Sequence, residues 1–185
     1  MLRNPLLLDR SRTGLLVIDI QEKILAVMAH PDRVVENTVR LIKGFKILGC
    51  PVFATEQYPE GIGKTVGPIK KALDDVEIRE KVTFSCCGIE GLTQLFRTQK
   101  IGQLVLCGIE SHVCVWQTAM DLVYDGFIVS VPRDTLSSRN DEDNEAVLNR
   151  MRAHGIEVTT TETVLFELVK EAGTDDFKKV AKLIK

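Results

Sequence analysis

Apolar residues along this chain follow two different spacings. Short continuous apolar runs, such as those at 15–18 and 104–107, are typical of strands buried on both faces of a sheet. Between such runs, apolar residues recur every three or four positions, as at 31–49, which predicts amphipathic helices. Strand and helix alternate five or six times, so the pattern predicts an α/β fold with a parallel sheet and helices on both faces.

The predicted elements cover most of the chain. Strands are expected at 15–21, 51–55, 76–80, 102–107, 127–131 and 156–159. The main helices are expected at 31–49, 66–73, 89–98, 111–124, 141–154, 159–169 and 177–184. Thr159 and Glu162 have the spacing of a capping box, which would start the helix that runs to Val169.

The helix expected at 111–124 is apolar on more than one face. Val113, Trp116 and Met120 form one stripe, whereas Val115 and Ala119 belong to another. A helix that is apolar nearly all round is buried on both sides. One side can cover the sheet, so the other is expected to meet a second helix or another copy of the chain.

Length and charge limit the possible functions. The 185 residues suffice for one domain with a full core, so we expect a single domain over 1–185. Basic and acidic residues number 24 and 26, for a net charge of −2, and there is no long basic run. Neither nucleic acid nor a membrane is therefore expected as a partner.

The five cysteines argue for a reducing compartment. Their number is odd, two of them are adjacent, and none has metal-ligand spacing. We therefore expect a cytoplasmic protein without structural disulfides. The five are Cys50, Cys86, Cys87, Cys107 and Cys114.

Three chemically complementary residues each follow a predicted strand: Asp19, Lys81 and Cys114. Because parallel strands end at one edge of a sheet, these residues can converge there. A carboxylate can accept the thiol proton, and an ammonium keeps the carboxylate ionised. The alternative for Cys114 is a small buried apolar residue, and for Lys81 a solvated one.

Cys114 is expected in the first turn of a helix that Ser111 caps. Free N–H groups and the helix dipole at that place favour an anion, so a pKa below the usual ~8.5 is predicted for the thiol. The same N–H groups would bind an oxyanion. His112 would point elsewhere, which disfavours a cysteine–histidine pair.

Five segments of the chain together match the pattern of a known family. They are 15–21 (LLVIDIQ), 55–63 (TEQYPEGIG), 81–85 (KVTFS), 108–115 (GIESHVCV) and 137–139 (SSR). On these segments the chain resembles the isochorismatase-like, or cysteine hydrolase, superfamily over almost its whole length. Within it, TEQYP and DFKK (176–179) are most similar to isochorismatase-domain-containing hydrolases of unassigned substrate.

The resemblance implies a three-layer α/β/α fold with a six-stranded parallel sheet, and a homo-oligomer of two or more copies. It implies Cys114 as nucleophile, Asp19 as general base and Lys81 as the cation that activates both. It also implies a cis peptide bond between Ile109 and Glu110. We expect the backbone amides of Glu110 and Cys114 to form the oxyanion hole.

Two departures bear on the substrate. Nicotinamidases of this superfamily carry an Asp-x-His metal motif after the second strand, whereas this chain has Glu56–Gln57–Tyr58–Pro59. We therefore expect no metal and no cofactor. True isochorismatases lack the nucleophilic cysteine, so the presence of Cys114 disfavours vinyl-ether cleavage.

Together these features predict a cysteine-dependent hydrolase of a small molecule, cleaving an amide-type C–N bond through a thioester. Two alternatives stay open: isochorismatase-type hydrolysis without covalent catalysis, and a non-enzymatic oligomeric scaffold. Substrate contacts are expected from Gln21, Tyr58, Phe84 and Trp116.

Overall fold

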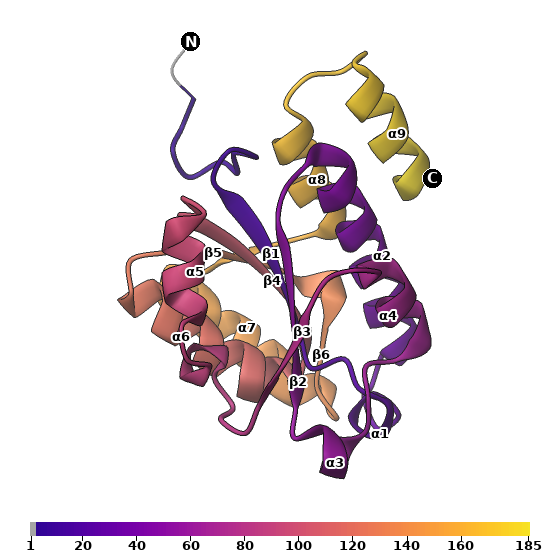
Figure 1. Cartoon of the computed structure of the whole chain (residues 1–185), viewed down its shortest axis with the longest axis vertical. Coiled ribbons are helices and arrows are strands. Elements are labelled where there is room, and N and C mark those ends of the chain that lie inside the picture. The colour runs from indigo at the N-terminus through magenta and orange to yellow at the C-terminus, as the bar shows by residue number, and fades with distance from the viewer. Residues whose placement is uncertain (1–2) are drawn as a thin grey trace.

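The computed structural model describes residues 3–185, which form an α/β fold around a parallel sheet (Figure 1). The strand order is β3-β2-β1-β4-β5-β7, and β6 pairs with β4 beside this path. The strands are β1 (Thr13–Ile18), β2 (Val52–Gln57), β3 (Ile78–Lys81), β4 (Gln103–Ile109), β5 (Ile128–Pro132), β6 (Leu136–Ser137) and β7 (Glu157–Thr159). The predicted fold class is confirmed. The six ordered strands match the six that were expected, and β6 is an addition inside a predicted loop.

Helices connect most of the successive strands, and two more follow the last strand. They are α1 (Glu22–Leu25), α2 (Pro31–Leu48), α3 (Pro59–Ile62), α4 (Gly67–Leu73), α5 (Leu92–Thr98), α6 (Trp116–Tyr124), α7 (Asp141–Ala153), α8 (Thr161–Val169) and α9 (Asp175–Ile184). Two 3₁₀ turns lie at Cys86–Gly88 and Arg133–Thr135, and a π-helical turn, Ser111–Val115, leads into α6.

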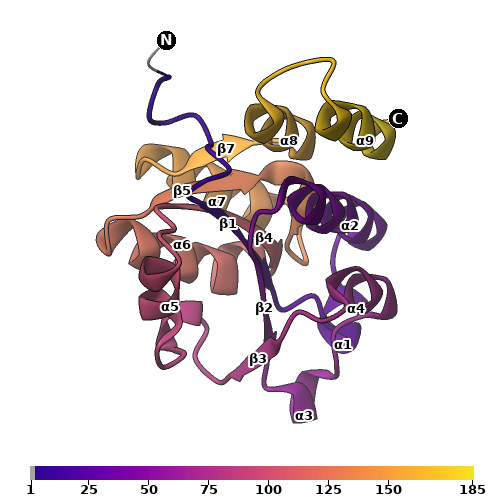
Figure 2. The same cartoon turned by 45° about the horizontal axis from the view of Figure 1, so that its top comes forward.

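The sheet separates two apolar cores. The turned view shows the helices that lie on its two faces (Figure 2). On one face, α2, α4, α8 and α9 pack over side chains such as Leu15 and Val105. On the other, α5, α6 and α7 cover Leu16 and Leu106. Neighbouring residues of β1 and β4 thus point to opposite faces, as alternation along a strand requires.

Two helix starts differ from the sequence-based expectation. Thr160, not Thr159, caps α8, because Thr159 ends β7 and the Thr160 hydroxyl accepts the N–H of Thr163 at 3.3 Å. Ser111 does not cap the helix after β4. Its hydroxyl instead lies 2.5 Å from that of Ser138, because β6 brings the following loop against β4.

Both apolar stripes predicted on the 111–124 helix are at least partly buried within a single copy of the chain. Val115, Ala119 and Leu122 are buried in the core, and Trp116 and Met120 pack against its margin. No helix within residues 3–185 has the length and apolarity needed to cross a bilayer.

Candidate active site

A buried ion pair lies at the carboxyl edge of the sheet. Asp19 directly follows β1 with a left-handed backbone (φ 53°), and Lys81 is the last residue of β3. The Lys81 Nζ lies 2.6 Å from Asp19 Oδ2, and each side chain is only 1% exposed. The structure therefore brings together two residues that are 62 positions apart in the chain.

Every hydrogen-bonding group of this pair has a partner. The Thr55 hydroxyl donates to Asp19 Oδ1 at 2.7 Å. The Lys81 ammonium also donates to Gln57 Oε1 at 2.7 Å and to the Phe84 carbonyl at 3.0 Å. Such contacts offset the desolvation cost that burying two charges brings.

Cys114 lies in the π-helical turn that follows β4, and only 5% of its surface is exposed. Thr118, one turn later, fixes the backbone there: its hydroxyl donates to the Cys114 carbonyl at 2.7 Å. The same hydroxyl accepts the N–H of Cys86 at 2.9 Å. Thr118 thus ties the turn that carries Cys114 to the loop after Lys81.

The acidity of the Cys114 thiol differs from the sequence-based expectation. Burial raises its pKa above the ordinary range, the Asp19 charge raises it further, and the Lys81 ammonium opposes both. The predicted lowering is wrong because desolvation outweighs the charge of the lysine and the backbone dipoles of the turn. The sulfur therefore holds its proton at rest.

Cys86 is a second buried thiol near the ion pair that the sequence analysis did not single out. Its sulfur lies 3.7 Å from the Thr55 hydroxyl, which also contacts Asp19. Burial raises the pKa of Cys86 to about 12. Its place in a loop soon after Lys81 was the available sequence signal.

The segment before Cys114 has the cis bond that the resemblance implies, between Ile109 and Glu110. The Glu110 carboxylate accepts a hydrogen bond from Arg139 Nε at 3.1 Å. His112 Nδ1 lies 2.8 Å from the Ser138 hydroxyl, so this ring is engaged with the loop after β6.

The four residues expected to contact substrate have different surroundings. The Gln21 amide is engaged with backbone groups of Gln57 and Gly63. Tyr58 and Phe84 are each 53% exposed. The Arg150 guanidinium lies 4.3 Å from the centre of the Trp116 ring, which therefore contacts α7.

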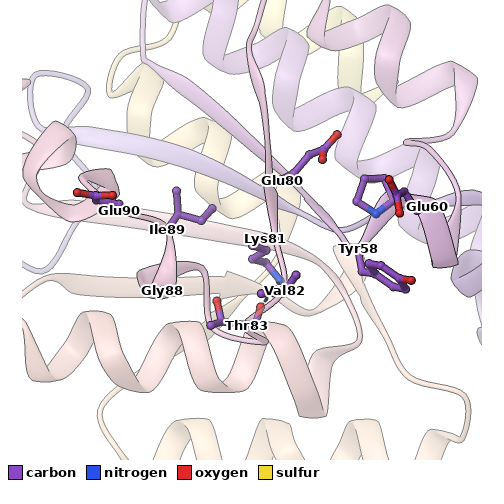
Figure 3. Close-up of a pocket in the computed structure, with 10 residues that line it drawn as sticks. Tyr58, Glu60, Glu80, Lys81, Val82, Thr83, Gly88, Ile89 and Glu90 are labelled. Carbon is purple, nitrogen blue, oxygen red and sulfur yellow. Dashed lines mark hydrogen bonds between the residues drawn. The ribbon is translucent and has the colours of Figure 1, made fainter.

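A cavity of about 400 Å³ opens beside β3 (Figure 3). Tyr58 and Glu60 lie on one side of the strand, and Ile89 and Glu90 lie on the other. Lys81 belongs to its wall, whereas Asp19 and Cys114 do not. The lysine is thus the residue shared by the cavity and the buried ion pair.

Potential metal ligands do not gather in the described part of the chain. Among residues 3–185, no three histidine, cysteine or acidic side chains lie close enough together to hold an ion. The polar atoms around Lys81 instead form hydrogen bonds with one another.

The chain is similar to known proteins over most of its length. Isochorismatase domain-containing protein 2 from Danio rerio is 36% identical over 170 residues, covering 92% of this chain and 85% of the relative. A structure described as the MAR1 ribonuclease from Caenorhabditis elegans is 35% identical, with a TM-score of 0.90 over 96% of this chain and 91% of the other.

A more distant structure has the same fold. The YcaC gene product of Escherichia coli, described as an octameric hydrolase of unknown specificity, is 22% identical, with a TM-score of 0.91 over 99% of this chain and 91% of the other. The isochorismatase domain model matches residues 13–163. These residues contain the Asp19–Lys81 pair and Cys114, and the chain belongs to the isochorismatase family.

Proposed function

We propose that this protein is a cysteine-dependent hydrolase that cleaves an amide-type C–N bond in a small molecule. Cys114 is the nucleophile, Asp19 the general base and Lys81 the cation that positions and activates both. The buried Asp19–Lys81 ion pair, beside a thiol whose pKa both residues affect, carries the proposal. Such perturbed groups are typical of catalytic sites.

The first half of the reaction forms a thioester. Because the resting thiol is protonated, Asp19 removes its proton as the sulfur attacks the substrate carbonyl carbon. The backbone N–H groups of Glu110 and Cys114 bind the resulting oxyanion. As the C–N bond breaks, Asp19 returns the proton to the departing amine.

The second half releases the acid product. The Asp19 carboxylate takes a proton from a water molecule that attacks the thioester, and the C–S bond then breaks. The proton passes to the leaving sulfur, which restores the Cys114 thiol. Throughout, the Lys81 ammonium stays within hydrogen-bond distance of the Asp19 carboxylate and positions it.

The cavity beside β3 supports a small-molecule substrate. Its volume of about 400 Å³ falls within the range of small-ligand pockets. Tyr58 lines it, and the Phe84 carbonyl contacts the Lys81 ammonium at 3.0 Å. We propose that substrate approaches from this side past Tyr58, Phe84 and Trp116, and that the buried Gln21 acts through the Gln57 backbone that it holds.

A substrate screen with a matched variant tests the proposal. Wild-type protein and Cys114→Ala are incubated with short amides and carbamoyl compounds, and released amine is measured. We expect turnover by wild type and none by Cys114→Ala. Cys107→Ala is the control, since that thiol is fully buried in the opposite core and should be dispensable for turnover.

Other outcomes favour the alternatives. If Cys114→Ala retains turnover, the Asp19–Lys81 pair works without a covalent intermediate, as isochorismatase-type chemistry requires. If wild type turns over nothing in the screen, the scaffold hypothesis is favoured.

RNA should be included as a substrate in the same screen, because the C. elegans relative is described as a ribonuclease. We expect no cleavage of RNA. The cavity is lined by the carboxylates of Glu60, Glu80 and Glu90, which repel phosphates, and the net charge of the chain is −2. Cleavage that Cys114→Ala abolishes would contradict the small-molecule proposal.

We also propose a homo-oligomer of two or more copies. Large apolar side chains are exposed near the cavity and at the end of α6, and exposed apolar patches commonly mark protein interfaces. They are Tyr58, Val82, Phe84 and Tyr124. Sedimentation of a monomer at micromolar concentration would contradict this.

A reducing, cytoplasmic location is proposed as well. All five cysteines are unpaired, and four of them are buried. Thiol counting on protein isolated rapidly from its host should find five free thiols. A disulfide between any two would argue for an oxidising compartment.

A further inference from the structure

The best-defined polar contact that the proposed mechanism leaves unused belongs to Gln57. This residue ends β2 and is paired in register with Lys81 of β3. Its side chain is buried, and its Oε1 accepts a hydrogen bond from the Lys81 ammonium at 2.7 Å. That distance is nearly as short as the 2.6 Å contact from the same ammonium to Asp19.

The orientation of the Gln57 amide is determined by its second contact. Its Nε2 donates to the Val82 carbonyl at 2.8 Å. A flipped amide would place N–H groups against the ammonium and a carbonyl against a carbonyl, so both contacts would be lost. The oxygen therefore faces Lys81.

Gln57 is itself held by Gln21, which is fully buried. The Gln21 Oε1 accepts the backbone N–H of Gln57 at 2.7 Å, and the Gln21 Nε2 donates to the Gln57 carbonyl at 3.0 Å. The second proton of that Nε2 reaches the Gly63 carbonyl at 2.6 Å. The Gln21 amide thus fixes the backbone from which the Gln57 side chain extends.

The ammonium has no spare proton. Asp19 and Gln57 take two, and the carbonyls of Phe84 and Thr83, at 3.0 and 3.2 Å, share the third. Asp19 supplies the one negative charge in this set, and Gln57 is neutral. A carboxylate in place of the Gln57 amide would compete with Asp19 for the same cation.

We propose that Gln57 is a positioning residue, a neutral acceptor that holds the Lys81 ammonium against Asp19 without diverting its charge. This inference rests on the proposed function of the Asp19, Lys81 and Cys114 side chains. Gln21 contributes to the same positioning because it holds the backbone of Gln57.

The rate at which Cys114 is alkylated as pH rises reports on this charge balance. The groups that act on the thiol are the Asp19 carboxylate, the Lys81 ammonium and the neighbouring Cys86 thiol. Because burial raises the pKa of this thiol above the ordinary range, the profile is read on its rising limb between about pH 7 and 10, where the alkylation rate increases about tenfold per pH unit. Weakening the influence of Lys81 disfavours the thiolate, so this rising limb moves to higher pH.

The experiment uses iodoacetamide and mass spectrometry to follow labelling of Cys114 in the full-length protein across pH. Gln57→Glu adds a charge where Gln57→Met adds none, and both remove the Nε2 contact to Val82. Gln94→Glu, at an exposed position of α5, is the matched control for charge. Circular dichroism checks that each variant is folded.

We expect Gln57→Glu to move the rising limb to higher pH by roughly one unit, which is about a tenfold lower rate at a given pH. Gln57→Met should move it by less, and Gln94→Glu should leave it in place. Equal shifts for the two Gln57 variants would overturn the inference, since a role in holding the Val82 loop affects both alike. An unshifted limb would overturn it too.

Two further outcomes are distinct. If Gln57→Glu does not fold, the Gln57→Met profile decides: a shift to higher pH supports positioning and an unchanged profile contradicts it. If Cys114→Ala retains turnover in the substrate screen, the proposed nucleophile fails, whatever the Gln57 variants do.

Discussion

At the scale of single residues, the site depends on one charge compensating another. Asp19 and Lys81 are each 1% exposed, so neither can be solvated once its partner is removed. Isolated buried charges are costly, and breaking such a pair typically costs about 3–5 kcal/mol of stability. The pair is therefore a structural constraint as well as a chemical one.

We expect Lys81→Met to destabilise the protein by about 3 kcal/mol or more, because the Asp19 carboxylate would stay buried without its cation. The double variant Asp19→Asn/Lys81→Met should be more stable than Lys81→Met, since it removes the remaining charge. Urea unfolding measures both.

A matched control is Lys178→Met, because the Lys178 ammonium and its partner, the Asp175 carboxylate, are both exposed. Loss of well under 1 kcal/mol is expected there. If Lys81→Met lost as little stability as the control, the Asp19–Lys81 pair would have to be open to water, although both side chains are buried.

At the scale of elements, the site requires β1 and β4 to approach closely. Gly108 of β4 is in register with Ile18 of β1 and has φ +133°, a backbone conformation that L side chains rarely adopt. A Cβ at this position would lie within 2.0 Å of the Ile18 carbonyl oxygen. Asp19 follows Ile18, and the turn with Cys114 follows Gly108, so this contact sets their separation.

Gly108→Ala is therefore expected to cost about 3 kcal/mol or more, from backbone strain and a backbone clash together. The control is Gly102→Ala at the start of the same strand region, where a Cβ meets nothing within 4 Å. Thermal unfolding of the two variants gives the comparison. Equal transition temperatures would mean that β4 can move away from β1 at no cost.

The elements also explain what the sequence could predict. An acid after a fully apolar run marks Asp19 because that run must be buried, and parallel strands bring their carboxyl ends together. Thr55, Gln57 and Cys86 were missed because their roles depend on strand register and on how the loop after Lys81 folds back. The π-helical turn was read as ordinary helix, since hydrophobic spacing does not distinguish the two over five residues.

At the scale of the whole molecule, buried thiols occupy both cores and the site between them. Cys107 lies in the core under α2, and Cys86 and Cys114 lie in the core under α6. Burial raises the pKa of Cys107 to about 12 and that of Cys50 to about 11. The folded chain therefore keeps protons that the unfolded chain releases in alkali.

This difference predicts a loss of stability as pH rises. Below the unfolded thiol pKa of about 9, both states are protonated and the thiols add no pH dependence. Above it, the unfolded state releases protons while folded Cys107 keeps its own up to about pH 12, so the free energy of unfolding falls across this window. For one thiol, the loss at pH 10 is about 1 kcal/mol.

Cys107→Ala should lower stability at pH 8 through the cavity it leaves, yet its stability should fall less between pH 8 and 10 than that of wild type. Val105→Ala, in the same strand and core, makes a cavity without removing a thiol and should keep the wild-type pH dependence. Lysines and tyrosines titrate alike in all three proteins, so the differences between urea unfolding curves isolate the thiol. Parallel pH dependences for wild type and Cys107→Ala would show that Cys107 ionises as readily in the folded chain as in the unfolded one.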